Sequence, residues 1–140
     1  MTIHQLSVFI ENKSGTLVKV LELFKDENIQ LLAITIADTA DYGICRIICS
    51  DPKKAYVVLK EAGLAVSLCE VFAIALDDIP GQAADAIDIF AREGISIAYL
   101  YSFLFHGKAM MVFRTDNAEK AREAIGANGL AVIEDRDLMR

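Results

Sequence analysis

Two short stretches of the chain, 66 residues apart, place polar or acidic side chains just before a glycine and a helical apolar pattern. They are residues 11–16 (ENKSGT) and 77–82 (DDIPGQ). A glycine at a helix start lets a ligand approach unpaired backbone N–H groups at the positive end of the helix dipole, which favours a carboxylate. Asn12 or Asp78 would accept hydrogen bonds from an ammonium group. Each stretch therefore predicts a site for the two charged ends of an amino acid.

The same stretches are also explained as ordinary turns, because Asn, Asp, Ser and Gly are common turn and cap residues. Their recurrence does not separate the two interpretations, since the turns of a fold recur with the fold. As a cap, Ser14 would close the start of the first helix, and Pro80 is tolerated in the first turn of its counterpart.

The other residues capable of chemistry form no catalytic or metal-binding pattern. His4 and His106 lie at non-equivalent positions without partners at metal-ligand spacing, so each is interpreted as a strand residue. Cys45 and Cys49 fall on one face of a predicted strand and are expected to be small buried groups. The sequence thus predicts a protein that is not an enzyme and uses neither a cofactor nor a metal.

Composition excludes further classes of function. The chain has 140 residues, with 14 Lys and Arg against 20 Asp and Glu, a net charge of −6, and 54% hydrophobic residues. The hydrophobic content excludes disorder, and the negative charge argues against nucleic acid and anionic lipid as partners. No apolar stretch reaches the roughly 18 residues of a membrane span. Three cysteines without a CxxC pair suit a reducing compartment, so we expect a cytoplasmic protein.

The chain contains two copies of one unit, related by an offset of 66 residues. This offset aligns GLAV at 63–66 with GLAV at 129–132, and it also superimposes glycines and phenylalanines of the helical patterns. Chance does not explain so many matches at a single offset. We place the copies at 1–69 and 70–140.

Each copy has the pattern strand, helix, strand, strand, helix, strand. Strands are expected at 6–10, 29–37, 44–49, 72–76, 95–105 and 109–113, and after each GLAV. Helices are expected to open at residues 14–15, 51–52, 80–81 and 116–117. This order predicts an α+β fold of two ferredoxin-like βαββαβ repeats side by side, each an antiparallel sheet with helices on one face. Residues 65–76 are a candidate for one continuous strand.

The strand after each first helix supplies apolar surface near the predicted sites. These residues are Ala33, Ile34 and Thr35 in the first copy, and Tyr99, Leu100 and Tyr101 in the second. The aromatic residues Tyr99, Tyr101, Phe103 and Phe105 alternate and so share one face of a strand. Such a stripe is more typical of a strand's core face than of a binding surface.

The repeat resembles the ACT domain, a small amino-acid-binding regulatory module. The resemblance is carried by residues 12–24 (NKSGTLVKVLELF) and 78–90 (DIPGQAADAIDIF), each of which continues into a strand. It covers nearly the whole chain as two tandem copies with no attached enzyme. It implies units that pair into an eight-stranded sheet, with ligand between the loop and helix start of one unit and the second strand of its neighbour.

The resemblance implies two unequal sites. One would combine Asn12, Ser14, Gly15, Thr16 and Leu17 with Tyr99, Leu100 and Tyr101. The other would combine Asp78, Gly81, Gln82 and Ala83 with Ala33, Ile34 and Thr35. The sites differ because Pro80 replaces Ser14 and because the tyrosines belong to one site only.

The resulting hypothesis is a stand-alone regulatory protein that binds a free amino acid between its copies and signals amino-acid status. Leu, Ile and Tyr side chains slightly favour a branched-chain or aromatic ligand, and the apolar content favours a homodimer. The alternative is a non-catalytic regulatory subunit that docks on an enzyme of amino-acid metabolism, with vestigial ligand sites. An enzyme ranks third, and a nucleic-acid binder, supported by the aromatic stripe alone, ranks last.

Overall fold

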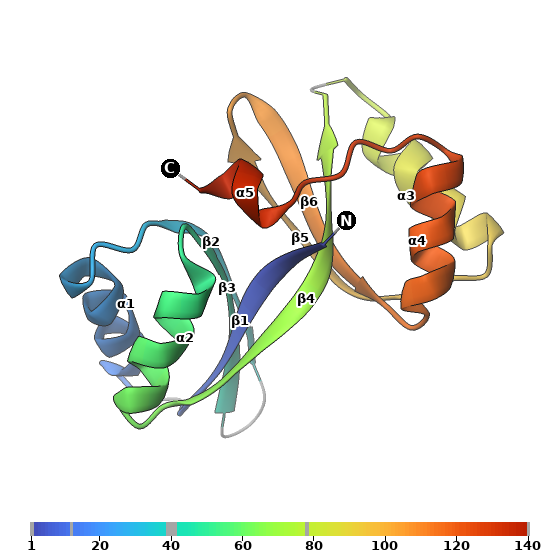
Figure 1. Cartoon of the computed structure of the whole chain (residues 1–140). Coiled ribbons are helices and arrows are strands. Elements are labelled where there is room, and N and C mark those ends of the chain that lie inside the picture. The colour runs from blue at the N-terminus through green and yellow to red at the C-terminus, as the bar shows by residue number, and fades with distance from the viewer. Residues whose placement is uncertain (1, 12, 39–41, 78, 140) are drawn as a thin grey trace. The chain divides into compact units, whose positions relative to one another are not determined.

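The computed structural model describes residues 2–11, 13–38, 42–77 and 79–139 (Figure 1). The chain divides into two compact units, the first built mainly from His4–Glu70 and the second mainly from Val71–Asp137. Each unit is described by itself below. The expected α+β content and antiparallel βαββαβ organisation are confirmed.

The first unit contains β1 (Thr2–Glu11), α1 (Thr16–Asp26), β2 (Leu31–Asp38), β3 (Tyr42–Cys49), α2 (Pro52–Glu61) and the start of β4 (Ala65–Leu76). Its strands lie in the order β2-β3-β1-β4, and β3 is antiparallel to both β1 and β2. Both helices lie on the same face of this sheet (Figure 1). This arrangement brings the loop after β1 and the start of α1 to one end of the sheet.

The second unit repeats this plan with the rest of β4, followed by α3 (Gln82–Arg92), β5 (Ile97–Phe105), β6 (Lys108–Thr115) and α4 (Ala118–Ala127). Strand β6 is antiparallel to β4 and β5. A short helix, α5 (Asp135–Leu138), follows. The candidate continuous strand at 65–76 is confirmed as β4, whose residues up to Glu70 belong to the first unit and whose later residues belong to the second.

The last strand expected after the second GLAV is reduced to a single antiparallel bridge between Ile74 and Val132. Two backbone hydrogen bonds hold it, from the Ala75 N–H to the Ala131 carbonyl at 2.8 Å and from the Ile133 N–H to the Ala73 carbonyl at 2.9 Å. The chain turns into α5 directly afterwards. The prediction of a full strand is therefore wrong in length, although the segment lies beside the expected neighbour, β4.

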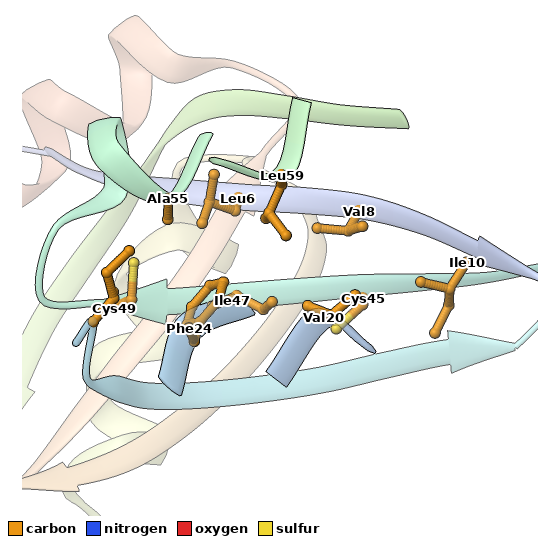
Figure 2. Packing of buried hydrophobic residues seen from close by; sticks show 11 residues of the cluster. Leu6, Val8, Ile10, Val20, Phe24, Cys45, Ile47, Cys49, Ala55 and Leu59 are labelled. Atoms are coloured by element: carbon orange, nitrogen blue, oxygen red, sulfur yellow. The ribbon is translucent and has the colours of Figure 1, made fainter. Parts of the chain in front are cut away.

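The core of the first unit lies between its sheet and its helices (Figure 2). Leu6 and Val8 of β1 meet Val20 and Phe24 of α1 and Leu59 of α2, and all five are at most 3% exposed. Alternate residues of β1 face this core, as the period of a strand requires. Burying each such side chain contributes about 1.5–3 kcal/mol, so packing fixes the position of α1 against the sheet.

An aromatic cluster occupies the equivalent core of the second unit. Phe72 of β4 stacks on Phe113 of β6 with ring centroids 5.7 Å apart, and Phe90 of α3 meets Phe113 edge-on at 5.1 Å. Offset and edge-on pairs are the favoured geometries of aromatic rings. The cluster anchors the C-terminal turn of α3.

The aromatic stripe forms the more buried face of β5, as expected: Tyr99, Tyr101 and Phe103 are half-buried and Phe105 is buried, whereas Leu100 and Leu104 are exposed. Leu100 pairs with Phe113 of the helix-packed core, whereas Tyr101 pairs with Val112, which is not part of that cluster. Paired residues share a face, so the stripe lies on the face opposite to the one that Phe113 occupies. The pairing of β5 with β6 also shifts in register between Ile97 and Tyr99.

Candidate functional site

The helices α1 and α3 begin in the same unusual way. Each is preceded by a glycine in the left-handed region, Gly15 with φ 91° and Gly81 with φ 87°, and neither start has a side-chain cap. A Cβ added at either glycine would meet no atom within 4 Å, so the space beside both starts is open. The prediction that Ser14 caps α1 is wrong, because Gly15 occupies the cap position and Ser14 lies outside the helix.

Among the described residues, several backbone N–H groups at these starts have no acceptor. The Thr16 N–H donates a long hydrogen bond of 3.4 Å to the Lys13 carbonyl. Further along α1, the Lys19 N–H donates to the Gly15 carbonyl at 3.2 Å. Within the described residues no acceptor is recorded for the N–H groups of Leu17 and Val18. The same holds in α3 for Ala83 and Ala84. Unpaired N–H groups at the positive end of a helix are suited to bind a carboxylate.

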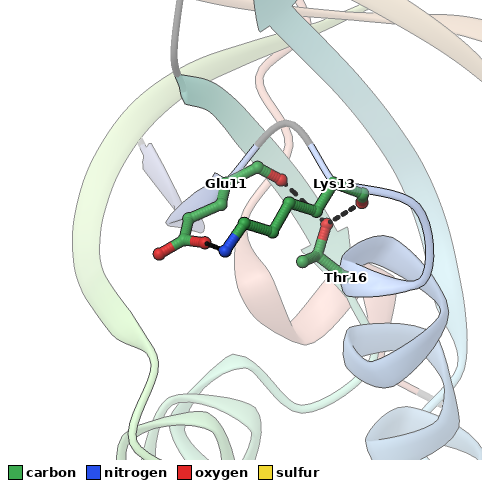
Figure 3. A network of polar contacts seen from close by, with 3 residues as sticks. All are labelled: Glu11, Lys13 and Thr16. Carbon is green, nitrogen blue, oxygen red and sulfur yellow. Dashed lines mark hydrogen bonds and ion pairs between the residues drawn. The ribbon is translucent and has the colours of Figure 1, made fainter.

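A polar network fixes the loop before α1 (Figure 3). The Thr16 hydroxyl lies 2.9 Å from the carbonyl oxygens of both Glu11 and Lys13, to which it donates. The carboxylate of Glu11 and the ammonium of Lys13 form an ion pair at 2.8 Å. Their mutual hydrogen bond lowers the pKa of Glu11 and raises the pKa of Lys13, and both side chains are exposed. The network satisfies Thr16 within the loop itself.

The described residues of the corresponding loop in the second unit form no such network. Gln82, which replaces Thr16, has a buried side-chain Oε1 without a hydrogen-bond partner in the part of the chain that the structure describes. Asp77 instead pairs with Lys108 of β6 at 3.5 Å. The two helix starts therefore share their backbone and differ in their side chains.

Each unit has a cavity of about 350 Å³ beside its uncapped helix start. The first is lined by Phe9, Ile10, Glu11, Thr16, Lys19, Tyr42, Gly63, Leu64 and Ala65. The second is lined by Ala75, Leu76, Asp77, Gln82, Asp85, Ala86, Ile89, Lys108, Gly129, Leu130 and Ala131. Sequence reasoning placed Thr16 and Gln82 in sites but did not include the GLA segments that form the far wall. The exact repetition of GLA at 63–65 and 129–131 is the sequence signal that could have indicated these lining residues.

The other predicted site residues are placed within their own units. Ser14, Gly15, Gly81 and Ala83 are exposed at the helix starts, and Leu17 is half-buried. On β2, Ala33 is buried, Thr35 is half-buried and Ile34 is 37% exposed; on β5, Tyr99 and Tyr101 are half-buried and Leu100 is 42% exposed. Asn12 and Asp78 lie outside the described residues. The combination of each loop with the second strand of the other copy stays a prediction.

The described residues contain no other arrangement suited to chemistry. Among them, no group of three or more His, Cys, Asp or Glu side chains could hold a metal ion. Cys45 and Cys49 are buried, as expected, and burial raises the pKa of the Cys45 thiol to about 11, so it is not an activated nucleophile at neutral pH. No described helix is long and apolar enough to cross a membrane.

Comparison with known proteins agrees with this architecture. The sequence matches the family described as an ACT domain pair over residues 1–140. A solved protein from Bacteroides thetaiotaomicron is 40% identical, with a TM-score of 0.92 over 100% of this chain and 97% of that one. The regulatory subunit of aspartate kinase from Thermus thermophilus is 17% identical, with a TM-score of 0.62 over 90% of each chain, which shows a shared fold. No curated protein sequence matches significantly.

Proposed function

Because this chain belongs to the ACT domain pair family, we propose that it is a non-catalytic regulatory protein that binds a free amino acid. The observation that carries the proposal is the pair of uncapped helix starts, where backbone N–H groups that follow left-handed glycines have no acceptor among the described residues. A carboxylate would accept hydrogen bonds from these groups and interact favourably with the helix dipole. Asn12 and Asp78 are the proposed partners of the ammonium group.

The two sites are proposed to be unequal. Proline at position 80 has neither the backbone N–H nor the hydroxyl that Ser14 offers. The Thr16 hydroxyl donates within its own loop, whereas the side-chain Oε1 of Gln82 has no partner among the described residues. In this proposal, the first site is completed by Tyr99, Leu100 and Tyr101, and the second by Ala33, Ile34 and Thr35. These side chains would favour a ligand with a branched-chain or aromatic side chain. The proposal requires that at least one of the two sites binds the amino acid.

Exposed apolar residues on the outer strands support association with a further chain. Ile34 and Ile36 of β2 are 37% and 46% exposed, and Leu104 of β5 is 82% exposed. Strands β2 and β5 each pair on one side only, with β3 and β6. We propose a cytoplasmic homodimer, in keeping with its free cysteines, with docking on an enzyme of amino-acid metabolism as the alternative role for this surface.

The first experiment is a thermal-shift panel of the twenty amino acids on the purified chain. A ligand at about 100 times its Kd adds about 2.7 kcal/mol to the free energy of unfolding, which raises the Tm by several degrees. A selective rise in Tm is expected for one amino acid or one chemical class. If all twenty are silent at millimolar concentration, the amino-acid proposal is wrong, and capture of a stoichiometric enzyme partner would favour docking.

Two matched substitutions then locate the site. Gly15→Asp and Gly81→Asp place a negative charge where the carboxylate would lie and are expected to abolish the stabilisation at their own site. Gly15→Asn and Gly81→Asn have the same shape without the charge, and Gly94→Asp puts the same charge at another left-handed glycine, with φ 70°. Stabilisation that survives both Asp variants places the ligand elsewhere.

A further inference from the structure

The C-terminal end of α4 carries an asparagine that is followed directly by glycine. The chain has four asparagines, and only Asn128 precedes a glycine, Gly129. The other three precede Lys13, Ile29 and Ala118, whose Cβ atoms crowd the backbone nitrogen that follows the asparagine. Glycine has no Cβ, so its nitrogen is open to reaction with the side chain before it. Asn128 is also exposed to solvent.

Deamidation at such a pair needs no reactant other than water. The Gly129 backbone nitrogen, after it loses its proton to solvent, forms a bond to the Cγ of Asn128, and the Cγ–Nδ2 bond breaks to release ammonia. Water then opens the resulting succinimide ring at either carbonyl, which leaves aspartate or isoaspartate at position 128. In isoaspartate the main chain runs through Cβ and is one atom longer.

The folded end of α4 holds the reacting atoms apart. The Nδ2 of Asn128 donates to the Ala124 carbonyl at 2.8 Å, and the Gly129 N–H donates to the Gly126 carbonyl at 3.3 Å. With ψ of Asn128 at 3°, the Gly129 nitrogen eclipses the backbone nitrogen of Asn128 and lies away from its Cβ, so the ring cannot close. Ring closure therefore requires this helix end to open, as helix ends do locally.

The reaction would alter the segment that follows α4. Residues 129–131 line the cavity of the second unit, and the Ala131 carbonyl accepts from the Ala75 N–H at 2.8 Å. A carboxylate at position 128 has no N–H to donate to the Ala124 carbonyl, and the negative end of the helix dipole repels it. The extra main-chain atom of isoaspartate also displaces residues 129–131 relative to β4. Deamidation thus changes the wall of this cavity.

The first unit has the same helix end without the reactive amide. Ala62 occupies the position equivalent to Asn128, with ψ at 2°, and precedes Gly63, whose N–H donates to the Lys60 carbonyl at 3.0 Å. Gly63 and Gly129 are both left-handed, with φ 84° and 61°. The two units share the backbone here and differ in the side chain that could react.

We propose that Asn128–Gly129 is a site of spontaneous deamidation, controlled by opening of the C-terminal end of α4, and that the modification alters the second unit and leaves the first unchanged. The proposal does not depend on the amino-acid ligand proposed above, because the reaction needs no ligand. Either proposal can fail without the other.

The test is incubation of the purified full chain at mildly alkaline pH, followed by peptide mapping with mass spectrometry. A parallel sample is unfolded in guanidinium chloride. We expect deamidation at Asn128 before Asn28 and Asn117, about tenfold more slowly in the folded chain, since opening breaks the hydrogen bonds of the helix end. Equal rates in both samples would overturn the control by folding. A folded chain that reacts first at another asparagine, or never at Asn128, would overturn the site.

Matched variants separate local opening from unfolding of the whole chain. Leu130→Ala removes packing beside the helix end and should speed deamidation of Asn128, whereas Leu64→Ala, the equivalent change in the first unit, should not. Equal acceleration by both would refute control by local opening. Ala62→Asn should create a second reactive site, in the first unit, and its failure to react would show that the shared backbone is not sufficient.

The effect on the second unit is measured by NMR of the ¹⁵N-labelled chain before and after deamidation. The amide signals of Ala75 and of residues 129–133 are expected to shift, and those of residues 63–66 to stay unchanged. Asn128→Gln, incubated in the same way, should show neither the mass change at position 128 nor these shifts. A deamidated chain with unchanged signals at 129–133 would refute the effect on the cavity wall.

Discussion

The two helices of each unit begin in different ways. Helices α2 and α4 are capped by Asp51 and Asn117, whose side chains accept from the N–H groups of Lys54 at 3.2 Å and Lys120 at 3.1 Å. Helices α1 and α3 start at left-handed glycines without any side-chain cap. A cap occupies the N–H groups that a carboxylate would need. The comparison therefore distinguishes two kinds of helix start: α2 and α4 are stabilised by a side-chain cap, whereas α1 and α3 have none. Each missing cap lowers the free energy of unfolding by about 1 kcal/mol.

The capped helix also supports the uncapped one. The ammonium of Lys54 donates to the Glu27 carbonyl, just beyond the end of α1, at 3.0 Å, and Lys120 donates to the Glu93 carbonyl beyond α3 at 2.8 Å. Both lysines thus bind the negative end of a helix whose positive end is open. Both the lysine contacts and the uncapped helix starts recur at the 66-residue offset. The two features are therefore shared by both units.

The largest expected effect concerns the packing that holds the uncapped helices. Phe24→Ala and Phe90→Ala remove side chains that are 3% and 0% exposed, and each should lower the free energy of unfolding by about 3–5 kcal/mol. Val18→Ala, at an exposed position of α1, should change it by less than about 0.5 kcal/mol. Urea unfolding of the three variants measures these changes in the free energy of unfolding. Losses below about 1 kcal/mol for both phenylalanines would mean that packing does not replace the missing caps.

The second effect concerns the left-handed glycines. Gly15→Ala and Gly81→Ala should each cost about 1–2 kcal/mol, because alanine is strained at these φ values. The Asn variants at the same positions should cost less, since Asn tolerates this conformation. Thermal unfolding distinguishes them. Equal losses for Ala and Asn would show that something other than backbone conformation selects glycine there.

The third effect isolates the caps. Asp51→Ala and Asn117→Ala should each lower the free energy of unfolding by about 1 kcal/mol and leave amino-acid affinity unchanged. Asp51→Asn retains the acceptor and serves as the control. The measurements are chemical denaturation and calorimetric titration. If Asp51→Ala or Asn117→Ala lowered the amino-acid affinity as much as Gly15→Asp does, capped and uncapped helix starts would not differ in ligand binding.

The smallest effect concerns the lysines that bind the ends of α1 and α3. Lys54→Met and Lys120→Met keep the length of the side chain and remove its charge, and should each cost about 0.5 kcal/mol or less, because the contacts are exposed. The loss should shrink as salt is added, since salt screens exposed charges. A salt-independent loss would assign the effect to the hydrocarbon stem instead.

The repeated pattern made most of the fold predictable from the sequence. Gly15 and Gly81 marked the starts of α1 and α3, and the starts expected at 51–52 and 116–117 agree with α2, which begins at Pro52, and with α4, which begins at Ala118. These features depend on local backbone chemistry, which a short window of sequence contains.

The errors have non-local causes. The full strand expected after the second GLAV is absent because α5 follows directly. The cavities were missed because Gly63 and Gly129 reach the helix starts only through the fold. Neither cavity could be predicted from a single motif.

The most direct test of the open helix starts is an NMR titration of the ¹⁵N-labelled chain with the amino acid that the panel selects. A carboxylate bound there would shift the backbone amide signals of Leu17 and Val18, or of Ala83 and Ala84, through new hydrogen bonds. The amides of Lys54 and Lys120, already bonded to their caps, should stay unchanged. An amino acid that binds tightly without shifting either pair at α1 or α3 would contradict the account.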